Sequence, residues 1–312
     1  MSVRRGTVAP VKPALRPGLL PLWRDQDTVQ IGIDPRRAVA ISGMSGAADV
    51  IRLLDGSRDR DQCIAEASRR GVPAAVAERI IGLLAAAGAV VDFPSGALRA
   101  LPPELREQLL PALATASVAE QDSDGGAGRL ARRSSCTVQV SGHGLLAELL
   151  ADLLTRSGLA AAWRGEQARQ ADLTVLVGRR SPVETAELLR RRQRYLSVYA
   201  DEAIGVVGPL VQPGVTACLR CIDLARAQRD PAWPLILAQL TERTANPPGC
   251  DAVLATTVAG QAAAQAVAFA DRSPLAQATA SATLELVLPS WQWRRRSWPP
   301  HPACTCGSYV AG

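Results

Sequence analysis

Two tight pairs of cysteines, far apart in the sequence, restrict the folds open to this chain more than any other feature. The motif CLRC contains Cys218 and Cys221, and the motif CTC contains Cys304 and Cys306, close to the C-terminus. Four thiolates are a common ligand set of structural Zn²⁺, and they leave no open coordination position for a water molecule. We therefore expect one zinc ion that holds the C-terminal segment against the segment around Cys218 and takes no part in chemistry.

Three other uses of these cysteines compete with zinc. A structural disulfide is rare in the cytoplasm, where we expect this protein because the sequence shows neither a secretory signal nor an uninterrupted apolar stretch that could span a membrane. A redox CxxC would leave the second pair unexplained. An iron–sulfur cluster also takes four cysteines, but no redox partner site is visible in the sequence.

The other three cysteines are expected to be buried structural thiols, since each lies near apolar residues. They are Cys63, Cys136 and Cys250. The role of Cys250 stays open, because it precedes a predicted helix N-terminus, where a thiolate would be stabilised.

The length of the chain favours two domains, and its charged residues do not point to a nucleic-acid partner. The chain has 312 residues, which is typical of two domains, and a net charge of +6 that is carried almost entirely by arginine. The runs Arg190–Arg192 and Arg294–Arg296 could contact phosphates. No aromatic ladder accompanies them, so we interpret both as solvated surface.

The N-terminal part, residues 1–92, is predicted to be a winged-helix domain. Residues 28–33 and 37–42 alternate as two strands around the turn DPRR. Three short helical patterns follow, over residues 46–56, 57–71 and 73–88, with Pro73 in the first turn of the third. Residues 93–135 are predicted to be a linker that is helical after Pro103 and then polar, glycine-rich and mobile.

The C-terminal part, residues 136–312, alternates strands with helices and ends in a hairpin around Pro289. This order predicts an α/β layer with a mostly parallel sheet. The first strand leads through Gly142 and Gly144 into a helix. Such a glycine turn could bring backbone N–H groups to a phosphate, but we favour a tight turn between strand and helix.

Residues 136–312 resemble the superfamily of ThiF, MoeB and the ubiquitin-activating enzymes. The motifs that carry this resemblance are VQVSGHGLLAELLADLL, ADLTVLVG, GPLVQPGVTACLRC, CDAVLATTVAGQAAAQA and CTC. The resemblance implies a Rossmann-like fold with a zinc knuckle, and ATP-dependent adenylation of the C-terminal carboxylate of a small protein or peptide.

Several parts of that ATP site are missing from this chain. Arg164 stands where the superfamily has an acidic residue after the second strand, and the arginine-bearing segment that should follow is absent. The later acidic position reads Gly178-Arg179-Arg180, and the one lysine is Lys12. We therefore expect a degenerate member that does not use ATP, with Gly142 and Gly144 as the remnant of its nucleotide turn.

The N-terminal part resembles the PqqD-type domain that recognises leader peptides. VQIGIDPRRAVAISG, LLDGSRDRDQCIAEA and AGAVVD carry this resemblance. It implies that a leader peptide adds as a strand to the hairpin edge and packs against the third helix. The residues concerned would be Val39, Ala40 and Ile41 on the edge, and Ile80, Ile81 and Leu84 on the helix, although these last three could equally be core.

Together the two parts resemble the partner protein of azoline-forming cyclodehydratases. That layout implies a non-catalytic, zinc-stabilised scaffold that presents a precursor peptide to a separate, ATP-using YcaO-type enzyme, and the superfamily often forms homodimers. Two other functions stay open, an active adenylyltransferase and a winged-helix DNA-binding regulator. The predicted third helix argues against DNA, since Arg79 is its only basic residue.

Overall fold

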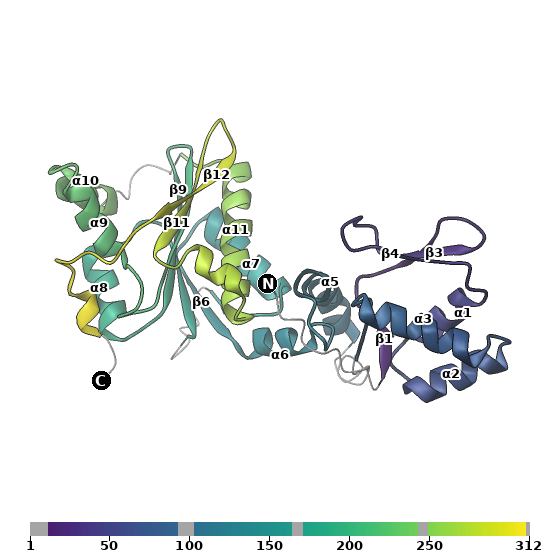
Figure 1. The fold of residues 1–312 in the computed structure, drawn as a ribbon. Helices are drawn as coiled ribbons and strands as arrows, with labels where there is room; N and C mark the ends of the chain where they lie inside the picture. Colours follow the sequence, from purple (N-terminus) through teal and green to yellow (C-terminus); the bar gives the residue numbers. More distant parts are fainter. Residues whose placement is uncertain (1–11, 93–102, 164–170, 243–248, 310–312) are drawn as a thin grey trace. The chain divides into compact units, whose positions relative to one another are not determined.

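The computed structural model describes residues 12–92, 103–163, 171–242 and 249–309. By their internal contacts the residues form two compact units, Met1–Ala131 and Arg132–Gly312. The two units are described separately, and Figure 1 shows the elements of each.

The sheets of the first unit are small. One is a three-stranded antiparallel sheet in the order β2 (Pro21–Trp23), β3 (Thr28–Ile31) and β4 (Val39–Ser42). β3 and β4 are the two strands expected around the turn DPRR. The other sheet pairs β1 (Pro13–Leu15) with β5 (Val90–Asp92).

Three helices pack beneath the three-stranded sheet, as the sequence predicts. They are α1 (Ala47–Leu53), α2 (Arg60–Arg69) and α3 (Ala74–Ala86). α2 begins after Asp59, whose side chain accepts the backbone N–H of Gln62 in a capping box. Buried residues of β3, β4 and the three helices form one core. It includes Val29, Val50, Cys63, Ala77 and Leu84.

The interval expected to be a linker contains two helices, α5 (Pro103–Glu120) and α6 (Ala127–Ser135). Leu109 and Leu113 of α5 are buried against Val91 and Leu130. The glycine-rich stretch is only the turn between the helices, where the Asp124 carboxylate accepts the backbone N–H groups that open α6. Burial of these leucines stabilises structure where polar composition alone suggests a mobile connector.

The second unit is built on a seven-stranded sheet. β7, β6, β8 and β9 are parallel neighbours, and β10, β11 and β12 continue the sheet as antiparallel strands, so that the sheet is mixed. Their bounds are β6 (Thr137–Ser141), β7 (Ala160–Ala162), β8 (Leu173–Val177), β9 (Tyr195–Asp201), β10 (Ile204–Val211), β11 (Ala282–Val287) and β12 (Gln292–Ser297).

Helices cover both faces of this sheet (Figure 1). α7 (Leu145–Arg156) and α11 (Ala252–Ala270) share one apolar core with the sheet. On the other face lie α8 (Pro182–Arg190), α9 (Leu219–Ala227) and α10 (Trp233–Glu242), and short 3₁₀ turns span Pro274–Ala278 and Thr305–Tyr309. α11 is long and apolar enough to cross a membrane, but half of it is buried in the unit, which is typical of a core helix.

Candidate metal centre and peptide-binding edge

The four cysteines predicted to bind zinc lie together in the second unit. Their sulfur atoms are all within 4.8 Å of one another. The Cys218–Cys304 sulfur distance is 3.7 Å, and the Cys221–Cys306 distance is 3.4 Å. Tetrahedral Zn²⁺ with Zn–S bonds of about 2.3 Å separates its sulfurs by about 3.8 Å. The arrangement is therefore compatible with a structural zinc ion.

Two segments bring these sulfurs together. Cys218 is the N-cap of α9, and Cys221 lies in the first turn of that helix. Cys304 and Cys306 follow β12 in the C-terminal segment, where the amide of Cys304 donates to the carbonyl of His301. Trp298 packs in the same apolar cluster. This packing holds the end of the chain against α9.

The pKa values of these thiols indicate how a cation would stabilise the site. A hydrogen bond with the Cys221 sulfur and burial raise the pKa of Cys218 far above its usual range. Burial raises the pKa of Cys306 to about 12, whereas the hydrogen bond from Cys218 lowers the pKa of Cys221 to about 4. Negative charge on one of these sulfurs thus opposes ionisation of its neighbours, and a bound cation would offset that repulsion.

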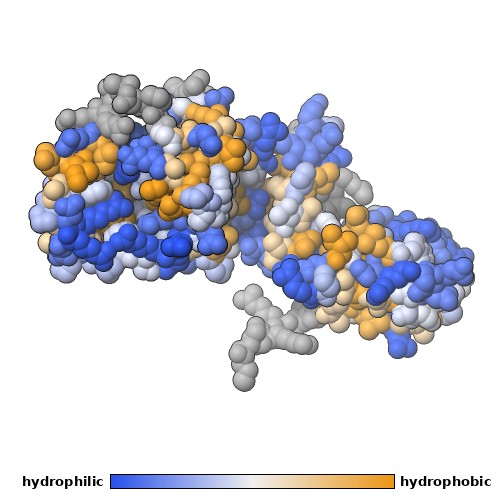
Figure 2. All heavy atoms as spheres, turned by 90° about the horizontal axis from the view of Figure 1, so that it is seen from above, coloured by the Kyte–Doolittle hydropathy of each residue, from blue (hydrophilic) through white to orange (hydrophobic). Residues whose placement is uncertain are grey.

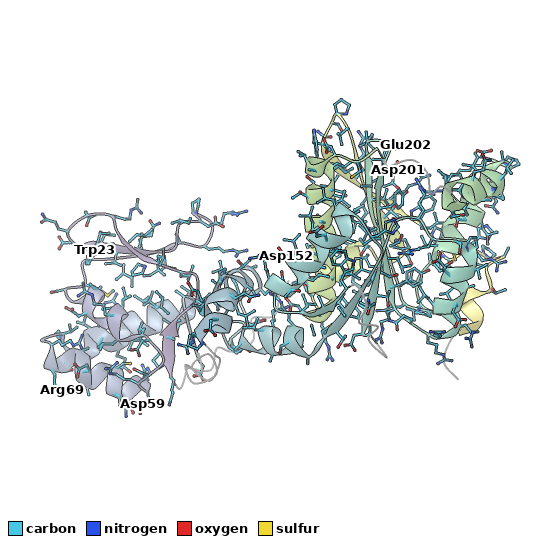
Figure 3. All side chains as sticks on the ribbon, turned by 180° about the vertical axis from the view of Figure 1, so that it is seen from behind. Trp23, Asp59, Arg69, Asp152, Asp201 and Glu202 are labelled. Atoms are coloured by element: carbon cyan, nitrogen blue, oxygen red, sulfur yellow. The ribbon has the colours of Figure 1, made fainter. Side chains whose placement is uncertain are left out.

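The pKa values of the other three cysteines are raised. Burial raises the pKa of Cys63, and it raises that of Cys136 to about 11. For Cys250, burial and the carboxylates of Asp251 and Asp201 raise the pKa as well. Asp201 lies at the β9–β10 turn (Figure 3) and accepts the amide of Gly249. The local charges therefore oppose the thiolate that a helix N-terminus would favour.

Close packing against Val177 accounts for the first glycine of the predicted nucleotide turn. A Cβ atom on Gly142 would lie 2.6 Å from the carbonyl oxygen of Val177, and its φ is +149°, so that only glycine fits between β6 and β8. Gly144 has a φ of +82° and open space around it. The close approach of β6 and β8 therefore explains why glycine stands at position 142.

Two side chains cover the carboxyl ends of β6 and β8, where open α/β sheets bind nucleotides. The Arg180 guanidinium donates to the carbonyl oxygens of Ser141 and Val177. The indole of Trp163 donates to the carbonyl of Gly142 at 3.1 Å. These contacts place protein side chains on carbonyl groups at the strand ends. The sequence motifs drew attention to Arg180 but offered no signal for Trp163.

In the first unit, the predicted edge strand β4 has β3 as its one partner strand among the described residues. The amide of Arg24 donates to the carbonyl of Thr28, and the amide of Gly32 donates to that of Leu20. Residues in even-numbered positions of β3 therefore bond toward β2. Because alternate residues of an antiparallel strand bond to opposite sides, the odd-numbered ones bond toward β4.

This alternation identifies the backbone groups at the free edge. Val39 and Ile41 of β4 pair with the odd-numbered residues of β3 and use their N–H and C=O groups in the ladder. The N–H and C=O groups of Ala40 and Ser42 consequently face outward. Both of these residues are exposed. An extended peptide could bond to them without displacing any part of the sheet.

Four of the six residues predicted for the peptide site have buried side chains. The side chains of Ile41, Ile80, Ile81 and Leu84 are buried in the core of the first unit, each no more than 3% exposed. Leu83, on the same helix, is 43% exposed. The helical spacing was compatible with both core and groove, and the structure places these four side chains in the core.

A groove of about 590 Å³ adjoins the amino end of β4. Its lining includes Val39 of the strand, Leu20 and Ile33 of neighbouring turns, and Ala114 and Val118 of α5. Leu20 and Ile33 are 64% and 80% exposed. Sequence analysis missed α5 as a wall of this groove, because the segment was expected to be a linker.

Apolar side chains are also exposed on β2. Leu22 and Trp23 are 36% and 60% exposed, and Figure 3 shows Trp23 on the three-stranded sheet. The space-filling view in Figure 2 likewise shows apolar residues at the surface. Exposed apolar groups that gather on one strand are typical of a protein-binding surface.

Comparison with known proteins reveals likeness in structure alone. No family model matches the sequence, and no curated protein matches it. The heterocyclase TruD has a TM-score of 0.64 and 18% identity, over 96% of this chain and 43% of its own. E. coli MccB with ATP has a TM-score of 0.61 and 12% identity, over 94% of this chain and 99% of its own.

Two further structures extend these likenesses. The microcin C7 biosynthetic enzyme MccB in complex with N-formylated MccA has a TM-score of 0.61 and 13% identity, over 95% of this chain and 99% of its own. A heterocyclase in complex with substrate and cofactor has a TM-score of 0.65 and 17% identity, over 96% of this chain and 40% of its own. This chain thus spans less than half the length of the heterocyclases. The likenesses show that the chain has the α/β fold of TruD and MccB, which supports the predicted ThiF-like fold.

Proposed function

We propose that this protein is a peptide-binding scaffold that presents a ribosomally made precursor peptide to a separate modifying enzyme. The observation that carries the proposal is the edge of β4, where Ala40 and Ser42 have backbone groups with no partner strand among the described residues, beside an apolar groove. Strand addition at such an edge uses main-chain hydrogen bonds for affinity and side-chain pockets for selectivity. The fold likeness to the heterocyclase TruD and to the microcin C7 biosynthetic enzyme MccB agrees with a role in peptide maturation.

In this proposal the second unit contributes structure and not chemistry. The four cysteines bind zinc and secure the C-terminal segment, and the Arg180 and Trp163 side chains occupy the strand ends that a nucleotide would need. A YcaO-type partner would then supply the ATP-dependent activation of peptide amides. The scaffold would act in the cytoplasm, and a homodimer is compatible with it.

The test is binding of fluorescently labelled candidate leader peptides, taken from precursor genes of the same genome, to the full-length protein. Ala40→Pro removes the outward N–H of Ala40 and leaves the bonds between β3 and β4 in place. We expect it to weaken binding about tenfold or more. Ala40→Ser, the matched control, keeps the backbone and should bind as the unchanged protein does. Equal binding by both variants would exclude strand addition at β4.

A second candidate function is adenylation of a carboxylate, which is favoured by the match to 99% of MccB, a protein solved with ATP. Calorimetry with ATP, with and without Mg²⁺, separates the two functions. The scaffold proposal expects no binding at millimolar nucleotide. Micromolar binding together with pyrophosphate exchange would make adenylation the function of the second unit.

A further inference from the structure

The second unit contains a cavity at the amino ends of its parallel strands, which neither the zinc site nor the peptide-binding edge explains. It has a volume of about 540 Å³. Three residues of its wall stand directly before a strand, Cys136 before β6, Asp172 before β8 and Arg194 before β9. Gly142 and Gly144 follow β6 and therefore belong to the opposite end of the sheet. The cavity is thus separate from the predicted nucleotide turn, and its size is that of a small-molecule site.

The charged groups around this cavity are predominantly positive. Three arginines and one aspartate line it, namely Arg132, Arg194, Arg272 and Asp172. The Cys136 thiol in the wall is neutral, because burial raises its pKa to about 11. The helices α6 and α11 also end at the cavity, and each C-terminus carries a partial negative charge of about 0.5. Three full positive charges against one full and two partial negative charges leave a positive balance, which favours an anion.

The guanidinium groups of these three arginines have neither a hydrogen-bond nor an ion-pair partner among the described residues. The Nε atom of Arg132 is buried as well. Its sequence neighbour Arg133, by contrast, donates to both carboxylate oxygens of Asp271. The one carboxylate of the wall, that of Asp172, accepts the backbone N–H of Thr137 instead. A buried N–H donor without an acceptor is unfavourable, so a ligand oxygen would restore a hydrogen bond that folding removed.

We propose that this cavity binds a phosphate group carried by a small polar molecule. The three arginines come from three segments, the end of α6, the residue before β9 and the turn after α11. A tetrahedral phosphate presents oxygens in several directions and can accept from all of them, whereas the two oxygens of a carboxylate lie in one plane and match a single guanidinium fork. A phosphate monoester also carries a charge of about −1.5 to −2 at neutral pH, which offsets the positive balance.

The rest of the wall favours a ligand larger than the phosphate ion. The side-chain amides of Gln212 and Gln277 line the cavity, and each can donate and accept hydrogen bonds. A cavity of about 540 Å³ is much larger than a phosphate ion, which would leave most of it to water. A polar body attached to the phosphate would contact these amides. Inorganic phosphate shares the same chemistry and is the alternative source that the test must separate.

Calorimetry on the full-length protein at constant ionic strength tests this with three probes, glycerol 3-phosphate, inorganic phosphate and acetate. We expect glycerol 3-phosphate to bind saturably and about tenfold or more tightly than acetate. Arg132→Gln should weaken its binding about tenfold, because the variant loses a charged donor inside the cavity. Arg272→Gln should weaken it less, since that side chain is exposed. Arg294→Gln is the matched control, because Arg294 is exposed on β12 and does not line the cavity.

Three results would overturn the proposal. They are no saturable binding of either phosphate compound at millimolar concentration, binding of acetate as tight as that of glycerol 3-phosphate, and unchanged affinity in Arg132→Gln. If Arg132→Gln does not fold, Arg272→Gln decides, and unchanged affinity in that variant would overturn it as well. Tighter binding of glycerol 3-phosphate than of inorganic phosphate supports an ester as the ligand. Equal or weaker binding would show that the free ion is the ligand and would overturn the ester.

Discussion

The two units differ in what occupies the edges of their sheets. In the first unit the lateral edge of β4 is open as far as the described residues go, with the backbone groups of Ala40 facing outward. In the second unit the carboxyl ends of β6 and β8 are covered by Arg180 and Trp163. An open edge offers hydrogen bonds that any extended chain can satisfy, whereas a covered one must lose contacts before a ligand enters. The comparison suggests that recognition belongs to the first unit at β4, and that the sheet end of the second unit is structural.

The largest expected effect comes from the metal centre and tests whether the units are independently stable. Structural zinc sites contribute on the order of 10 kcal/mol of apparent binding free energy. Cys218→Ser should release zinc and unfold much of the second unit at ordinary temperature. The unfolding transition of the first unit should persist, as followed by calorimetry beside metal analysis.

Cys250→Ser is the control for that experiment, because Cys250 lies outside the cluster. It should keep one zinc ion per chain. Unchanged zinc content in Cys218→Ser would contradict the four-thiolate site, and loss of both transitions would contradict the independence of the units.

A smaller effect is expected from the buried ion pair of the second unit. The guanidinium of Arg133 donates to both carboxylate oxygens of Asp271 at 2.8 and 2.6 Å, and both side chains are less than 10% exposed. Asp271→Ala leaves a buried positive charge and should cost the second unit about 3–5 kcal/mol. Chemical denaturation measures this cost. Arg156→Ala, which breaks an exposed pair with Asp152, should cost less than about 1 kcal/mol.

In the first unit, Ile80→Ala distinguishes core from binding surface. Ile80 is fully buried, so the substitution leaves a cavity and should lower the unfolding free energy by about 2–5 kcal/mol. Under conditions where the variant is folded, its affinity for a leader peptide should be unchanged. Leu83→Ala, on the exposed side of α3, should have the smaller effect on stability. A large loss of affinity in a folded Ile80→Ala protein would return this residue to the peptide site.

The smallest effect concerns the glycine turn. Gly142→Ala places a Cβ against the carbonyl of Val177 and should destabilise the second unit by about 1–3 kcal/mol. Gly144→Ala meets no neighbour and has only its positive φ to oppose it, so it should cost less. Thermal unfolding of both variants measures the difference. Equal costs would mean that packing against β8 is not what selects glycine at position 142.

Local patterns predicted the elements of both units well. The alternation around DPRR corresponds to β3 and β4, and the apolar spacing over residues 73–88 corresponds to α3. The covered strand ends were not predictable in the same way, since Trp163 lies beyond β7 and reaches Gly142 only through the packing of the sheet. The contribution of α5 to the core was not predicted either, because its apolar residues are buried only where they pack against β5 and α6.

By itself, the sequence determined the short-range features of this protein. These are the strands, the starts and ends of helices, and the two cysteine pairs, one with CxxC and one with CxC spacing. These depend on backbone preferences and on neighbours within a few residues. Tertiary structure alone decided that the four sulfurs meet and that the side chains of Ile80 and Ile81 are buried. An amphipathic pattern specifies which side of a helix is apolar, whereas the partner of that side is chosen only when distant segments pack together.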